Sequence, residues 1–187
     1  MKVKGSVSPG AAMAAGVLIY YTSTRNLMAL ALPVLAHELG HLLVLRMFGC
    51  QIRELSLELG GLCIRYSGTP GSKAAAASAF AGPLAGLLYA LAAAHCGSFG
   101  ALSAGFSLIL SAYNLIPALP LDGGRIAEAL LPPRASMLIG LISAIATAVL
   151  GLWLLVAGMG GALAAAGAFL LLWQLFSQSK SSAMLPD

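Results

Sequence analysis

Residues 34–43 read VLAHELGHLL, which places three ionisable side chains inside an apolar run. His37, Glu38 and His41 lie within five residues of one another, among leucine, alanine and valine. Ionisable groups inside a bilayer cost free energy and usually mark function. We therefore interpret this stretch as the functional centre of a helix that lies in a membrane.

The composition supports a membrane location. Of the 187 residues, 59% are hydrophobic and only 9% are charged, and the mean hydropathy is +0.92. A soluble domain carries about 25% charged residues, so the chain is predicted to be a polytopic membrane protein. The net charge of +4 comes from basic residues that are dispersed along the chain. Because they form no basic patch, we expect no nucleic-acid partner.

Hydrophobic runs of about the 20 residues that cross a bilayer can be placed six times. The first is short and is interrupted by Pro9. We predict one membrane domain of six spans over residues 1–176 and a polar C-terminal tail over 177–187. The six predicted spans lie near 7–23, 27–48, 74–95, 100–117, 136–157 and 160–176.

The basic residues predict the orientation of these spans. If the N-terminus is cytoplasmic, nine of the ten Lys and Arg residues fall on the cytoplasmic side, and only Arg25 falls outside. Short cytoplasmic loops carry an excess of Lys and Arg. We therefore expect a multi-pass protein of the cell membrane with both termini in the cytoplasm.

The segment between the second and third spans, RELSLELGGLCIRYSGTPGS (53–72), has a strand pattern. Leucines alternate with polar residues over 54–59, Gly60-Gly61 supplies a turn, and LCIRY can return as a second strand. We predict a β-hairpin at the cytoplasmic interface, with an irregular surface loop as the alternative. The predicted fold class is an all-α polytopic membrane protein of six transmembrane helices with this small interfacial β-hairpin.

The spacing of the two histidines suits a metal. On a helix, His37 and His41 lie on one face, one turn apart, so both imidazoles can bind a single zinc ion. Glu38 is adjacent but rotated, and it can act as general base on a water molecule. The alternative is a pair of histidines that hydrogen-bond inside a helix bundle. Three polar groups within five residues of a lipid-embedded helix weaken that alternative.

A catalytic zinc site needs a third protein ligand. Asp122 is the candidate, in NLIPALPLDGGRI (114–126), where Pro117 and Pro120 break the helix. Gly123 and Gly124 follow it and let the backbone approach closely. A carboxylate on unwound chain at membrane depth is tolerated where it lines a cavity or is buried in protein. The alternative is that Asp122 caps a short helix over 123–131, and both roles can coexist.

Several motifs occur in the order of a known family. H-E-L-G-H (37–41), AGPLAG (81–86) and N-x-x-P-x-x-P-x-D-G (114–123) resemble the site-2 protease family of intramembrane zinc metalloproteases. NLIPALPLDGGR and the six-span layout most resemble the branch that includes stage IV sporulation protein FB. The resemblance implies that one zinc ion per chain is bound by His37, His41 and Asp122. It also implies that Glu38 is the base and that Asn114 positions substrate or stabilises the oxyanion.

Two features depart from that family. Many relatives carry Asn shortly after the Gly-Pro of the third span, where this chain has Gly86, so a substrate-positioning role there is not carried over. Gly82 and Gly86 instead form G-x-x-x-G, which suits close helix packing. The CBS domain of the sporulation branch and the PDZ domains of other relatives are not found in this sequence, so regulation by them is not expected.

The resemblance implies an intramembrane zinc endopeptidase that cuts a membrane-anchored protein near the cytoplasmic face. Its partners would be that substrate, the lipid bilayer and a membrane-protein regulator, and its pathway regulated intramembrane proteolysis, with sporulation sigma-factor processing as the branch's example. The alternative is a metal transporter or a non-catalytic membrane zinc-binding protein. Transporters usually show internal repeats with broken helices in matching positions, and the sequence shows none.

Overall fold

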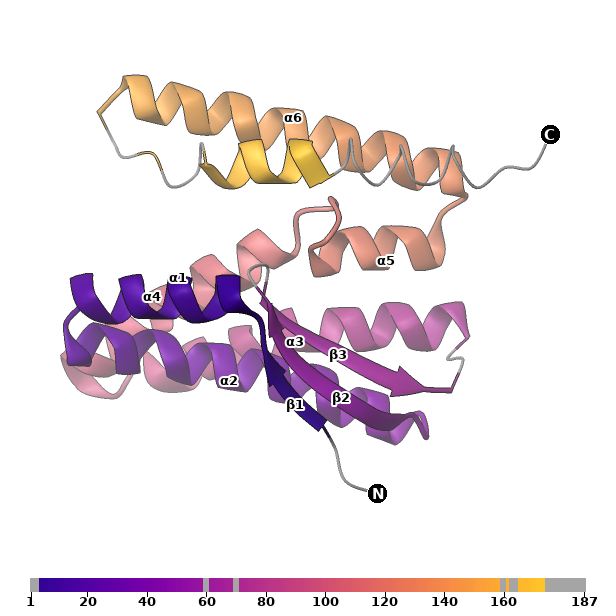
Figure 1. Ribbon diagram of the computed structural model, residues 1–187, viewed down its shortest axis with the longest axis horizontal. Helices are drawn as coiled ribbons and strands as arrows, with labels where there is room; N and C mark the ends of the chain where they lie inside the picture. Colours follow the sequence, from indigo (N-terminus) through magenta and orange to yellow (C-terminus); the bar gives the residue numbers. More distant parts are fainter. Residues whose placement is uncertain (1–3, 59–60, 69–70, 159–160, 162–164, 174–187) are drawn as a thin grey trace. The chain divides into compact units, whose positions relative to one another are not determined.

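The computed structural model describes residues 4–58, 61–68, 71–158, 161 and 165–173 (Figure 1). The chain forms two compact units, Met1–Asn114 and Leu115–Asp187. The predicted tail, 177–187, lies outside the described residues, and so does part of the predicted sixth span.

Four helices lie in the first unit: α1 (Pro9–Tyr21), α2 (Thr24–Met47), α3 (Ser72–Ala93) and α4 (Gly97–Asn114). The helices α2, α3 and α4 pack against one another and form the body of this unit. The sequence analysis predicted that Pro9 interrupts the first span. In the structure Pro9 does not interrupt α1. It occupies the start of α1, where its missing N–H needs no partner, and the Ser8 side chain caps the helix by accepting from the Ala11 N–H.

Small residues fill the interfaces of these helices. The buried positions of α3 are alanines, glycines, one serine and Pro83, while large apolar side chains such as Leu88 and Leu91 are exposed. A soluble protein would bury its leucines first. Small residues between helices and large apolar residues on the outside are typical of helices that pack in lipid, because they let backbones approach closely.

The predicted hairpin is present and carries a further strand. β2 (Gln51–Glu58) pairs antiparallel with β3 (Gly61–Ser67), as the leucine alternation suggested. β1 (Lys4–Val7) pairs parallel with the other edge of β2, so the strand order is β1-β2-β3 (Figure 1). The sequence did not predict β1, which had been included in the start of the first span.

The leucines of β2 do not form its buried face. Ser56 and Ile52 are buried, whereas Leu57 is exposed. A register irregularity between Ile52 and Glu54 changes which side chains share a face. The alternation therefore predicted the strand correctly, but Leu57 is exposed and Leu55 is only half-buried.

The second unit contains α5 (Asp122–Leu130) and α6 (Pro133–Val156), and residues 165–173 are helical. The segment 115–121 between α4 and α5 is not helical and contains a cis peptide bond between Leu119 and Pro120. It is folded by two backbone bonds, from the Ala118 N–H to the Ile116 carbonyl and from the Leu121 N–H to the Ala118 carbonyl, at 2.7 and 3.0 Å.

Among the described residues, three helices are long and apolar enough to cross a membrane: α2, α3 and α6. They correspond to the predicted second, third and fifth spans. The first and fourth spans correspond to α1 and α4, with α4 ending at Asn114 rather than near 117. A mostly helical membrane protein with a small sheet is thus confirmed, and the count of six spans stays a prediction.

Candidate metal centre

One face of α2 points into the helix bundle. Its buried residues recur at every fourth position, as Ala29, Pro33, His37, His41 and Leu45. This spacing follows the helical repeat, so the two histidines lie on the inward face. Burial thus places both imidazoles between α2 and its neighbours, as the spacing of the sequence motif predicted.

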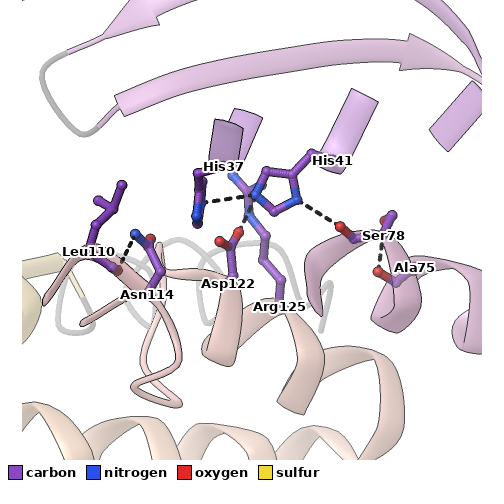
Figure 2. A network of polar contacts seen from close by, with 8 residues as sticks. All are labelled: His37, His41, Ala75, Ser78, Leu110, Asn114, Asp122 and Arg125. Carbon is purple, nitrogen blue, oxygen red and sulfur yellow. Dashed lines mark hydrogen bonds and ion pairs between the residues drawn. The ribbon is translucent and has the colours of Figure 1, made fainter. Parts of the chain in front are cut away.

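The His41 ring is oriented by a backbone carbonyl. Its Nδ1 lies 2.7 Å from the Ser78 carbonyl oxygen on α3 (Figure 2). A carbonyl oxygen only accepts hydrogen bonds, so Nδ1 carries the proton and donates. In the neutral ring Nε2 then keeps its lone pair, which is the form that binds a metal. Histidine ligands in metal sites usually donate their other N–H in this way.

The two ligand-type nitrogens face each other. His37 Nε2 and His41 Nε2 are 3.2 Å apart, with the rings nearly perpendicular (Figure 2). Two nitrogens bound to one tetrahedral zinc ion at 2.0–2.1 Å would stand about 3.3 Å apart. The observed separation is close to this value, and in this structure it also makes the two rings hydrogen-bond partners, the contact that the alternative interpretation expected.

Gly82 on α3 makes room for the His41 ring. A Cβ added at Gly82 would overlap Nε2 and lie 2.5 Å from Cε1. On α2, a Cβ at Gly40 would overlap the Ala81 carbonyl oxygen, so the two backbones approach closely here. The G-x-x-x-G pattern of α3 therefore serves packing, and its first glycine holds a predicted metal ligand in place.

Two predicted catalytic residues also belong to the first unit. Glu38 follows His37 on α2 and is half-buried. Asn114 is the last residue of α4, and its side-chain amide donates to the Leu110 carbonyl oxygen at 3.0 Å. That bond uses one N–H of the amide and leaves a second N–H and the side-chain oxygen as further hydrogen-bonding groups.

Asp122 lies in the second unit, where it is buried at the first residue of α5. Leu121 is the N-cap residue, so the alternative that Asp122 caps a helix over 123–131 is wrong in its register. The carboxylate still lies in the first turn, where the helix dipole favours negative charge. The Arg125 guanidinium lies 3.9 Å from it, one turn along the helix.

The glycines after Asp122 fix it against the preceding loop. A Cβ at Gly123 would overlap the Leu115 carbonyl oxygen and lie 2.5 Å from that of Ile116. A Cβ at Gly124 would lie 2.5 Å from backbone atoms of Ala118 and Leu119. Only glycine allows the loop to fold this closely onto the start of α5, as the sequence suggested.

The comparisons with known proteins agree with this geometry. The Site-2 Protease from Methanocaldococcus jannaschii has the same fold, with a TM-score of 0.63 and 22% identity over all of this chain and 95% of that one. "Putative zinc metalloprotease Rip3" of Mycobacterium tuberculosis is 33% identical over 135 residues, or 62% of this chain and 33% of the relative. "Putative zinc metalloprotease sll0528" of Synechocystis is 37% identical over 111 residues, or 52% and 28%.

The chain spans about a third of the length of these curated relatives. No family model matches it. The similar fold is that of a site-2 protease and the relatives in sequence are named zinc metalloproteases, so the predicted resemblance to the site-2 proteases is confirmed, while the sporulation branch stays a prediction. The names of the relatives also agree with the predicted enzyme class and with zinc as its metal.

Proposed function

We propose that the chain is an intramembrane zinc endopeptidase that cleaves a membrane-anchored protein near the cytoplasmic face. The observation that carries this proposal is the pair of Nε2 atoms 3.2 Å apart, with His41 held in the metal-binding tautomer by the Ser78 carbonyl. Its test is cleavage of a tagged single-span substrate by the wild-type protein and not by Glu38→Gln.

Three buried residues, His37, His41 and Asp122, supply two imidazoles and one carboxylate, each with one ligand atom. This donor set suits a catalytic zinc ion, which takes three protein ligands of these kinds. When bound, zinc polarises the scissile carbonyl and lowers the pKa of water toward about 7. We therefore assign one zinc ion per chain to these residues, in agreement with the names of the relatives.

The remaining steps use side chains of the protein. Glu38 accepts a proton from the attacking water and passes it to the leaving amine, the usual work of a positioned carboxylate. Asn114 retains a side-chain N–H beyond its bond to Leu110, and it donates this N–H to the substrate carbonyl as charge develops there. Both residues lie on helices of the same unit as the histidine pair.

The sheet offers a way to hold an extended substrate. β1 and β3 cover the two edges of β2, and within the described residues no strand pairs with the outer edge of β3, so a further strand could be added there. The Leu57 carbonyl accepts from the Ser8 N–H, so Leu57 faces β1. Backbone groups alternate sides along a strand, so Leu55 also faces β1, and its partner Ile64 must direct its N–H outward. A substrate strand added there would be held unwound.

We further propose six spans with both termini cytoplasmic, on the sorting of nine of the ten basic residues to one side. Over residues 1–176 they form the catalytic domain. The resemblance of NLIPALPLDGGR to the sporulation branch makes a sporulation sigma factor one candidate substrate, with a membrane-protein regulator as a second partner.

A further inference from the structure

The three-stranded sheet carries a row of alternating charges across its strands, which lie side by side in the order β1-β2-β3 (Figure 1). Lys4 on β1 is the register partner of Glu54 on β2, and Glu54 is the partner of Arg65 on β3. Directly opposite residues of neighbouring strands have their side chains on the same face of a sheet. From β1 to β3 the charges of this row are therefore positive, negative and positive, and the last one lies on an edge strand.

The contacts of Glu54 engage both of its carboxylate oxygens. Oε1 accepts from the Ser6 hydroxyl at 3.3 Å, and Oε2 accepts from Nη1 of Arg65 at 3.3 Å. These contacts agree with a shared face for the three side chains. A guanidinium has five N–H donors, this ion pair uses only its Nη1 end, and the Arg65 side chain is 65% exposed. Arg65 can therefore bind a second carboxylate.

The position of Arg65 along β3 brings its side chain close to an added strand. Within the described residues, the outer edge of β3 pairs with no other strand. Ile64 directs its N–H to that edge, so the next residue, Arg65, directs its own N–H toward β2. Beside an added antiparallel strand, Arg65 thus occupies a non-hydrogen-bonded position, where facing Cα atoms are only about 4.5 Å apart. Side chains are closest at such positions, so the residue opposite Arg65 meets its charge directly.

We propose that Arg65 selects substrates that present an acidic residue in the strand added to β3, an inference that rests on the proposed function. A carboxylate opposite Arg65 continues the alternation of charges with a negative fourth position. Facing residues of opposite charge stabilise strand pairing, and facing like charges destabilise it. The two neighbours of the acid lie on the other face of the sheet, with Ile64 and its partner Leu55, and are apolar. The substrate class is a single-span protein with an apolar-acidic-apolar sequence at the cytoplasmic end of its span.

This preference separates substrates from many other membrane proteins. Short cytoplasmic segments next to a span carry an excess of Lys and Arg. A basic residue opposite Arg65 would place two like charges face to face on neighbouring strands, which disfavours the pairing. Arg65 thus favours the less common acidic segment over the common basic one.

The test varies one substrate position at a time. A single-span peptide that the wild type cleaves is prepared with Glu, Gln or Lys at each position in turn around the cleaved bond, and kcat/KM is measured for each peptide. With the wild type, one position should favour Glu over Gln by about two- to fivefold, the worth of one cross-strand charge pair, and Lys should be the poorest of the three. Because exposed charge pairs are screened, added salt should reduce both differences.

Variants of the protein then identify the partner of the acid. Arg65→Gln should remove the preference, and the double exchange of Glu54→Arg with Arg65→Glu should reverse it in favour of Lys. The exchange retains an Arg–Glu pair between β2 and β3, so it controls for the loss of that pair. Arg53→Gln is the matched control, because Arg53 is an exposed base on the inner strand β2, and it should retain the wild-type preference for Glu. Thermal unfolding without substrate checks that each variant is folded.

A wild type that prefers Glu at no position would overturn the inference, and so would a preference that Arg65→Gln retains or that a folded exchange variant does not reverse. An equal loss of preference in Arg53→Gln would also overturn it, because a general attraction of acidic peptides would then explain the effect. In each of these cases cleavage continues and the proposed function stands. A wild type that cleaves no substrate, or a Glu38→Gln variant that cleaves, would show that the proposed function has failed, and the inference would fail with it.

Discussion

Replacing Gly82 by alanine should displace a predicted zinc ligand without removing it. The new methyl would overlap His41 Nε2 and lie 2.5 Å from Cε1. Ordinary contact begins near 3.4 Å, so the ring has to retreat by about 0.9 Å at Cε1. Ligand distances in metal sites are tolerant to only about 0.2 Å. The move would also stretch the 2.7 Å bond from Nδ1 to Ser78.

Losing the correct orientation of one ligand usually weakens metal affinity by about 10- to 100-fold. We expect that loss for Gly82→Ala, measured as zinc affinity in competition with a chromogenic chelator on detergent-solubilised protein. Gly105→Ala on α4 is the matched control, because its added Cβ meets nothing within 4 Å. Both variants gain the helix propensity of alanine, so propensity cannot explain a difference between them.

The reasoning would be refuted if Gly82→Ala bound zinc with wild-type affinity. It would also be refuted if Gly105→Ala lost affinity to the same extent, since the effect would then come from alanine in a helix and not from contact with His41. Thermal unfolding without metal checks that both variants are folded.

Three further predictions concern the third ligand, the topology and the substrate. Asp122→Asn should lower zinc retention or abolish cleavage, because an amide is a weaker ligand than a carboxylate; wild-type zinc content with full activity would show that the ligand is misassigned. Reporters fused after residue 98 should be external and those after Lys180 cytoplasmic, and the reverse at both sites would overturn the topology. Ile64→Pro should reduce cleavage sharply at normal zinc content because it removes an outward N–H, whereas Ile64→Ala should do less. Leu57→Pro should instead remove an N–H on the side of the strand that faces β1, where the Leu57 carbonyl accepts from Ser8, and wild-type cleavage by both proline variants would make the sheet a spacer.

The helices α2 and α3 could be predicted from sequence because each is a long apolar run with clear limits. The starts and ends of α2 and α3 differ from the predicted spans by one to three residues, as the ends of helices commonly do. The His37 and His41 pair was predictable for the same kind of reason, since a spacing of four residues is close to the 3.6 residues of one helical turn.

β1 was not predictable in this way. Lys4–Val7 pairs with residues 54–57, far along the chain, and a parallel pairing leaves no turn signal between its strands. The exposure of Leu57 on β2 could not be predicted, because alternation shows only that a strand has two faces. It does not show which face meets protein when the other meets lipid.

The contacts that orient His41 could be predicted from the sequence only in part. His41 is oriented by the Ser78 carbonyl, and every residue has a carbonyl, so no side-chain pattern could indicate that bond. Gly82 was noted for its G-x-x-x-G spacing, but its contact with the His41 ring depends on how α2 and α3 meet.

The most direct test of the account is a comparison of Glu38→Gln with wild type. Each is co-expressed with a tagged single-span substrate and then purified for elemental analysis. The account predicts that wild type yields a shortened fragment, that Glu38→Gln yields none, and that both retain about one zinc ion per chain, because Glu38 moves a proton and is not a ligand. Cleavage by Glu38→Gln at the wild-type rate would contradict the account and leave only metal binding for this site.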